Sequence, residues 1–386
     1  MKKILVIGGN AESLINFRGE LIKRFLSNKL AVYASAGGQS NNLKNWFDKL
    51  DVKFIPLPLD RTGINPYKDF IFFIKLLFTI KKINPDIVLA YTVKPVIYGM
   101  LASRISNIKN CYALITGLGY ALVDPKSLKQ RVVNIIVSSL YKFSLKSVNL
   151  VFFQNQDDLN YFFKKKILTK SVKVKKINGS GVDLDYYSYI KPNFRKEGIN
   201  FLLIARLLKD KGIYEYVSAA KMVYKLFPEK NISFSILGSF DSNPESITFE
   251  EVEQWNRIGL INYLGETDDV RPYIEKCSVY VLPSYREGMP RSVLEAMSMG
   301  RAIITTDVPG CKETVISGKN GYLVKVKSSQ ELATAMIKFI ENDKLIEEMG
   351  LYSRQLACKK FNVHEINSIM LEEMKITNYH NRDKLN

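Results

Sequence analysis

Two glutamates, Glu287 and Glu295, lie eight positions apart in a stretch whose residue types are suited to ligand binding. Residues 279–282 are apolar and predict a strand, which Pro283 ends. A helix is predicted from Pro290 to the residue before Gly300, because proline fits the first helical turn and glycine ends a helix. Glu287 is therefore predicted on a loop beyond the carboxyl end of a strand, and Glu295 within the following helix.

The segment between these glutamates is predicted to hold an anion. The backbone N–H groups of residues 288–292 lie at the predicted helix start, where the helix dipole favours negative charge. Open α/β sheets bind ligands beyond the carboxyl ends of their strands, and carboxylates accept hydrogen bonds from hydroxyl groups. The pattern favours a phosphate flanked by two polyols, as in a nucleotide sugar. Two glutamates alone are more often solvated surface residues, so the interpretation depends on the surrounding sequence.

The stretch from residue 281 to 300 resembles the E-x7-E signature of retaining glycosyltransferases of family 4, which have the GT-B fold. The likeness continues through residues 300–310 and 318–324 downstream and 204–212 upstream, and it covers about residues 1–375. The resemblance implies an α/β protein of two Rossmann-like, doubly wound domains facing across a cleft. It also implies a C-terminal helix that crosses back to the first domain.

The resemblance also implies roles for individual residues. Arg206 and Lys211 would bind the donor diphosphate and stabilise the leaving group as the glycosidic bond breaks. Glu295 would accept hydrogen bonds from the ribose, and Glu287 from the transferred sugar. Glu287 is not expected to be a nucleophile, since double displacement needs a carboxylate beneath the anomeric carbon. The catalytic candidates are Glu287, Arg206 and Lys211, and the donor-binding candidates are Glu295, Gly288, Met289, Pro290 and Gly9.

Further candidates lie on the first domain. Gly9 belongs to a two-glycine turn after the first predicted strand, and this turn lacks the G-x-G-x-x-G pattern, so no dinucleotide is predicted. Arg18 could face an acceptor diphosphate. The acceptor-side candidates are Asn16, Arg18, Lys94, Thr116 and Gly117, each of which could equally have a structural role.

The first domain departs from the family pattern at one position. Many relatives carry a histidine on the first domain. This chain has only His364 and His380, which both lie near its C-terminus. In similar bacterial relatives a histidine lies beside the lysine that corresponds to Lys94, and here that neighbour is Val93. No histidine base is predicted on the first domain, and the departure weakens any carry-over of the relatives' sugar specificity.

The charge of the chain is concentrated in its first half. Residues 1–190 hold 29 Lys and Arg against 12 Asp and Glu, and so account for +17 of the net +18. Two segments, 67–82 and 127–146, combine basic and apolar residues in a way that favours an anionic membrane surface. Neither has the roughly 20 apolar residues of a spanning helix, and both could be ordinary sheet-covering helices. No nucleic-acid-binding motif is present, so no nucleic-acid partner is predicted.

Length and pattern predict two domains. Apolar strands alternate with amphipathic helices along the 386 residues, which is typical of parallel sheets covered on both faces. A polar segment with proline and glycine, 189–198, is the predicted linker. The predicted domains are 1–188, facing acceptor and membrane, and 199–360, which binds the nucleotide sugar. A crossover helix with a tail is predicted for 361–386.

No metal or other cofactor is predicted. Asp183 and Asp185 have the Asp-x-Asp spacing of a metal-binding motif, but they lie where the family has an interdomain edge. The four cysteines are scattered, and the chain starts directly with a strand and has no signal peptide pattern. These features predict a cytoplasmic protein that is peripheral on the inner face of the cell membrane.

Together these observations predict a retaining, metal-independent glycosyltransferase. It would move a sugar, an N-acetylhexosamine or its 6-deoxy form, from a UDP-sugar to a polyprenyl-diphosphate-linked saccharide. The product would be an O-antigen, capsule or other glycan. A GT-B nucleotide-sugar epimerase is the alternative, and it would need acid and base groups but no acceptor. A non-catalytic module that binds membrane or nucleic acid is a further alternative.

Overall fold

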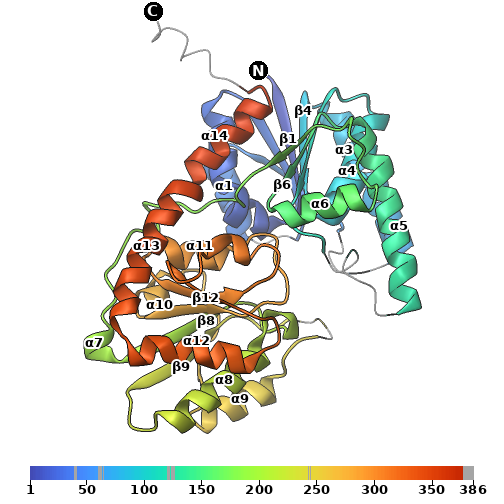
Figure 1. The fold of residues 1–386 in the computed structure, drawn as a ribbon. Coiled ribbons are helices and arrows are strands. Elements are labelled where there is room, and N and C mark those ends of the chain that lie inside the picture. Colours follow the sequence, from blue (N-terminus) through green and yellow to red (C-terminus); the bar gives the residue numbers. More distant parts are fainter. Residues whose placement is uncertain are drawn as a thin grey trace, which may run out of the picture. The chain divides into compact units, whose positions relative to one another are not determined.

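The computed structural model describes residues 1–38, 41–59, 63, 65–119, 122, 127–241, 243 and 245–376. These residues form two compact units (Figure 1). The first unit contains residues 1–180 and the C-terminal residues from His364 onward, and the second contains residues 181–363. The tail predicted beyond residue 376 lies outside the described residues.

The first unit is built on a seven-stranded parallel sheet with the strand order β3-β2-β1-β4-β5-β6-β7. Its strands are β1 (Lys3–Asn10), β2 (Ala31–Gly37), β3 (Lys53–Pro56), β4 (Ile87–Tyr91), β5 (Asn110–Ile115), β6 (Leu150–Phe153) and β7 (Val174–Lys176). Its helices are α1 (Ala11–Ser27), α2 (Asn41–Lys49), α3 (Pro66–Ile83), α4 (Val93–Ile105), α5 (Leu128–Ser144), η2 (Leu145–Ser147) and α6 (Gln156–Lys164).

Helices cover both faces of this sheet because successive strand residues point to opposite sides. Ile4 and Val6 of β1 belong to a core shared with α1, whereas Leu5 and Ile7 belong to a second core shared with α3 and α4. All four side chains are fully buried. The continuous apolar run of β1 is therefore the pattern of a strand buried on both faces.

The C-terminal helix α14 (Val363–Glu373) packs into the first unit. Ile366 and Met370 are part of the same core as α1. The Tyr112 hydroxyl donates to the carbonyl of Met374 at 3.0 Å, and Lys175 pairs with Glu373 at 2.6 Å. The predicted return of the C-terminal helix to the first domain is confirmed.

The second unit has a six-stranded parallel sheet with the order β10-β9-β8-β11-β12-β13. Its strands are β8 (Ile199–Ile204), β9 (Ile232–Leu237), β10 (Asn262–Tyr263), β11 (Val279–Leu282), β12 (Ala302–Thr306) and β13 (Gly321–Val324). Its helices are α7 (Phe194–Glu197), η3 (Lys209–Lys211), α8 (Ile213–Leu226), α9 (Phe249–Arg257), α10 (Arg271–Glu275), α11 (Arg291–Ser298), η4 (Lys312–Thr314), α12 (Ser329–Glu341) and α13 (Lys344–Lys360). Two doubly wound α/β units confirm the predicted fold class.

The division between the units lies at residue 180, before the predicted linker at 189–198. Val182 is tied to the end of the second unit, because its N–H donates to the carbonyl of Phe361 at 2.8 Å and its own carbonyl accepts from Val363. Gly181 also packs closely on Val363. Residues 181–188, predicted as part of the first domain, therefore belong to the second unit.

Among the described residues, none of the helices combines the length and the apolar character that a membrane crossing requires.

Candidate active site

Two predicted site residues of the second unit, Lys211 and Glu287, form an ion pair. Lys211 ends η3, which follows β8, and Glu287 lies on the loop after β11. The Lys211 Nζ lies 2.6 Å from Glu287 Oε1, and the side chains are only 15% and 18% exposed. Burial by itself would lower the pKa of Lys211. The nearby carboxylates of Glu287 and Asp210 raise this pKa by more, so the net effect is a raised pKa. Lys211 is therefore a permanent positive charge at this site.

Backbone contacts fix the loops that carry this pair. Gly212 has a φ of 73°, and a side chain there would collide with the carbonyl of Pro283. The turn into α8 can lie against the end of β11 only because the residue is glycine. On the other side, the N–H of Glu287 donates to the carbonyl of Pro309 at 3.1 Å. Glu287 is thus held between the loops that follow β11 and β12.

Glu295 lies within α11, as predicted, and is only 7% exposed. Its Oε1 accepts from the Nε of Arg291 at 2.8 Å, and the Tyr187 hydroxyl also hydrogen-bonds its carboxylate. Burial raises the pKa of Glu295, while Arg291 and Tyr187 act in the opposite direction. Glu295 is therefore a buried acid held in place by two neighbours.

The helix α11 starts at Arg291, one residue after the predicted start. Pro290 is the N-cap, with an extended backbone and no side-chain cap for the N–H groups that follow. Gly288 and Met289 are half-buried on the approach to the helix, and Pro290 is buried. The first turn of α11 thus offers backbone N–H groups and the helix dipole beside Glu287, which is a suitable environment for an anion.

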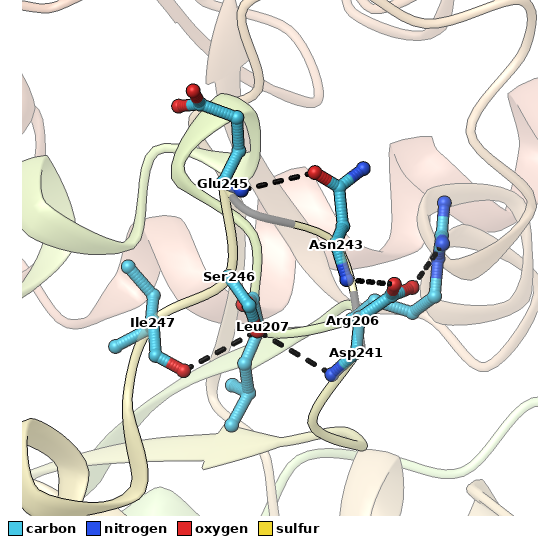
Figure 2. A network of polar contacts seen from close by, with 7 residues as sticks. All are labelled: Arg206, Leu207, Asp241, Asn243, Glu245, Ser246 and Ile247. Carbon is cyan, nitrogen blue, oxygen red and sulfur yellow. Dashed lines mark hydrogen bonds and ion pairs between the residues drawn. The ribbon is translucent and has the colours of Figure 1, made fainter. Parts of the chain in front are cut away.

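Arg206 follows β8 and is 41% exposed. Its guanidinium pairs with Asp241, which lies on the loop after β9 (Figure 2). Neither Asp241 nor Tyr187 was singled out by the sequence. Each is remote along the chain from the residue that it contacts, and neither belongs to a motif that indicates this role.

The first-unit candidates lie where β1, β4 and β5 end. Gly9 is buried, and a side chain there would press on the Thr92 hydroxyl. Thr92 itself has a φ of 70°, a strained conformation for a β-branched residue that typically costs about 1–3 kcal/mol. Thr116 and Gly117 are half-buried directly after β5. The carboxyl ends of parallel strands meet at one edge of the sheet, so these residues share that edge.

The two basic candidates of the first unit make contacts within that unit. Arg18 is only 3% exposed, and its guanidinium lies over the Tyr91 ring, 5.0 Å from the ring centre. Lys94 pairs with Asp69 at 2.6 Å and is 15% exposed. Asn16 is exposed on α1. Their predicted contacts with an acceptor remain predictions.

Across the described ranges, no group of three or more His, Cys, Asp and Glu side chains is placed to hold a metal ion. Metal independence remains a prediction.

Two doubly wound parallel-sheet units are the architecture of the GT-B class of glycosyltransferases. Residues 189–356 match the family model of glycosyl transferases group 1, and residues 31–155 match that of glycosyl transferase 4-like proteins. Together the two models span most of the chain and confirm its predicted resemblance to the family 4 glycosyltransferases of GT-B fold.

The chain is similar to two curated enzymes over most of its length. One is the N,N'-diacetylbacillosaminyl-diphospho-undecaprenol alpha-1,3-N-acetylgalactosaminyltransferase of Campylobacter jejuni, at 29% identity over 86% of this chain and 88% of the relative. The other is the UDP-Gal:alpha-D-GlcNAc-diphosphoundecaprenol alpha-1,3-galactosyltransferase of Escherichia coli, at 25% identity over 84% of each chain.

Solved structures confirm the fold. Anabaena HepE in complex with UDP and glucose superposes with a TM-score of 0.77 at 18% identity, covering 97% of this chain and 100% of that one. The sucrose-phosphate synthase of Thermosynechococcus elongatus gives a TM-score of 0.79 at 17% identity, covering 97% of this chain and 98% of the other.

Proposed function

We propose that this chain is a retaining glycosyltransferase that moves a sugar from a UDP-sugar to a polyprenyl-diphosphate-linked saccharide. The observation that carries this proposal is the Lys211–Glu287 pair beside the first turn of α11, with Glu295 one helical turn further on. A diphosphate at that helix start would be next to the Lys211 ammonium, and Arg206 lies on the loop of the neighbouring strand. Positive charge there stabilises the leaving UDP, where negative charge develops in the transition state.

The carboxylates have separate roles in this proposal. Glu295 accepts hydrogen bonds from the ribose hydroxyls, and Glu287 accepts from hydroxyls of the transferred sugar. Lys211 contacts one oxygen of Glu287, so Glu287 is suited to orienting a sugar rather than to forming a covalent bond with it. Transfer then takes place on the face from which the donor phosphate leaves, and that phosphate helps to remove the acceptor proton.

The relatives support the acceptor class. The names of both the Campylobacter and the Escherichia enzyme include a diphospho-undecaprenol-linked sugar. The sugars that they transfer differ, one being an N-acetylgalactosamine and the other a galactose. We therefore propose a lipid-diphosphate-linked acceptor in glycan or capsule biosynthesis. For the transferred sugar we keep the prediction from the sequence, an N-acetylhexosamine or its 6-deoxy form.

A membrane-facing surface on the first unit fits such an acceptor. Helices α3 and α5 both pack beside α4 (Figure 1) and carry large apolar side chains that are exposed to solvent. These side chains are Tyr67, Phe70 and Phe78 on α3, and Leu128, Val132, Ile135, Ile136 and Phe143 on α5. The five on α5 share one face of the helix, and exposed Lys129, Arg131 and Lys142 lie among them. Basic amphipathic helices of this kind bind anionic bilayers peripherally.

We place the reaction at the inner face of the cell membrane. Cys111, Cys277, Cys311 and Cys358 are free thiols, which is typical of a reducing compartment.

The test is UDP release from a panel of UDP-sugars, with a short polyprenyl-diphosphate saccharide as acceptor. The wild type should release UDP only when the acceptor is present. Glu295→Gln should lower kcat/KM by about 10- to 100-fold, because the variant loses a charged hydrogen-bond acceptor for the ribose. Glu253→Gln, at the exposed Arg257 pair on α9, is the matched control and should leave activity unchanged.

Two outcomes would contradict the proposal. Conversion of the UDP-sugar without acceptor would favour the epimerase alternative. Full activity in the folded Glu295→Gln variant would remove the ribose-binding role of Glu295.

A further inference from the structure

The carboxylate of Asp241 is the ion-pair partner of Arg206. Asp241 Oδ2 accepts from Arg206 NH1, and Asp241 is the more buried of the two, at 19% exposed against 41% for Arg206. A long side chain that is two-fifths exposed has many rotamers, and holding it in one of them costs conformational entropy. Asp241 restricts that freedom before any ligand arrives.

The loop that carries Asp241 is fastened to the segment that carries Arg206 (Figure 2). The N–H of Asn243 donates to Asp241 Oδ1 at 3.0 Å, so this carboxylate oxygen has a backbone partner. The carbonyl of Leu207 accepts from the Ser246 hydroxyl at 3.0 Å and from the N–H of Ile247 at 2.8 Å. The Asp241 carboxylate is therefore fixed relative to the backbone at Arg206.

The order of the strands shows from which side Asp241 meets Arg206. Arg206 follows β8, which lies between β9 and β11 in the sheet. Asp241 follows β9, whereas Glu287 and the start of α11 follow β11. Asp241 thus approaches Arg206 from the side opposite to the helix start where the diphosphate is expected.

We propose that Asp241 is a positioning residue, which holds Arg206 by one nitrogen and leaves the rest of the guanidinium free to bind the donor diphosphate. A guanidinium has five N–H donors in a planar fork, so it can bind a carboxylate and a phosphate at the same time. This inference rests on the proposed function, in which Arg206 contacts the diphosphate. Asp241 touches neither substrate in this arrangement and acts only through Arg206.

The experiment compares the binding of UDP and of uridine to the full chain by isothermal titration calorimetry. Asp241→Asn keeps the side-chain shape and an oxygen for the Asn243 N–H, and it removes both the charge and the second acceptor oxygen that hold Arg206. We expect the Kd for UDP to rise by about three- to tenfold, the cost of ordering one long side chain on binding. The Kd for uridine, which has no phosphate, should not change.

Two further variants make the test specific. In an Arg206→Ala background, adding Asp241→Asn should have no further effect on UDP, because the side chain that Asp241 positions is gone. Glu253→Gln makes the same change of charge on α9, the next helix after this loop, and should leave both Kd values as in the wild type.

The outcomes separate this inference from the proposed function. If the wild type binds UDP and Asp241→Asn binds it equally well, Asp241 does not position Arg206. Tighter UDP binding by Asp241→Asn would also overturn the inference, and would mean that Asp241 competes with the diphosphate for Arg206. If the wild type fails to bind UDP at all, the proposed donor is wrong, and the inference is lost with it.

Discussion

The carboxylate of Glu295 is buried, so little water reaches it and its ionisation depends on its protein neighbours. Burial favours the neutral acid and raises its pKa. The Arg291 guanidinium and the Tyr187 hydroxyl favour the charged form and partly offset burial, and Tyr280 also lies close enough to interact with it. The ionisation of Glu295 therefore depends on a balance between burial and a few neighbours.

Tyr187→Phe should shift that balance and, with it, the pH dependence of UDP binding. The ionised carboxylate is the better acceptor for ribose hydroxyls, so affinity should be full above the pKa of Glu295 and fall as the pH drops through it. Without the Tyr187 hydroxyl that pKa is higher, so the fall should begin at a higher pH. The measurement is the Kd for UDP as a function of pH.

The control for this prediction is Tyr186→Phe, which removes a hydroxyl from the neighbouring ring, 48% exposed. Its pH profile should match the wild type. Identical profiles for Tyr187→Phe and the wild type would mean that Tyr187 does not influence the ionisation of Glu295.

At the scale of elements, Arg301 joins three parts of the second unit. It precedes β12 and is completely buried. Its Nε donates to the carbonyl of Ile274 at 2.7 Å, NH1 to that of Ile190 at 2.9 Å, and NH2 to that of Glu275 at 3.3 Å. Arg301 thereby ties the end of α10 and the segment before β8 to the start of β12. The predicted linker, which contains Ile190, is fastened to the second unit in this way.

Arg301→Met should destabilise the second unit strongly. Methionine fills much of the same volume but loses three hydrogen bonds from a charged donor, and a hydrogen bond of this kind contributes roughly 1.5–3 kcal/mol. We expect the free energy of unfolding to fall by about 3–5 kcal/mol in urea denaturation. Arg257→Met, at a side chain 78% exposed, should change it by less than about 0.5 kcal/mol. Equal stability of the two variants would show that the three contacts of Arg301 contribute little.

At the scale of the whole molecule, the strongest feature is the separation of charge between the two halves of the chain. Nearly all of the net +18 lies in residues 1–190. Each basic residue near an anionic bilayer contributes on the order of 1 kcal/mol, and the contribution falls off within a Debye length. Charge and exposed apolar side chains coincide on α5 of the first unit.

Ile135→Asp should weaken binding to anionic vesicles. Ile135 is 65% exposed in the middle of the apolar face of α5, and Ile258, after α9 in the second unit, is 66% exposed. In cosedimentation with phosphatidylglycerol-containing vesicles, we expect Ile135→Asp to lower the bound fraction and Ile258→Asp to leave it unchanged. Phosphatidylcholine vesicles or high salt should release the wild type. Equal effects of the two substitutions would argue against α5 as the membrane-binding element.

The sequence by itself determined the class of fold and the general place of the site. Runs such as 4–7 and 279–282 are apolar throughout, which is the pattern of strands buried on both faces, and Pro290 with Gly300 delimits a helix between two strands. These signals are local, because the residues that favour a strand or helix and the residues that end it lie within a few positions of one another. Glu287 and Glu295 could be assigned to a loop and a helix for that reason, and the structure places them there.

Only the tertiary structure decided how the side chains of the site are paired. Lys211 meets Glu287 across 76 positions and Arg206 meets Asp241 across 35, and Tyr187 reaches Glu295 from a segment that the sequence assigned to the other domain. The same kind of contact, between Val182 and Phe361, moves the boundary of the second unit back to residue 181. Such pairs depend on which strands lie side by side and on which loops pack together at the sheet edge. That arrangement is set by burial of the whole core rather than by any local pattern of residues.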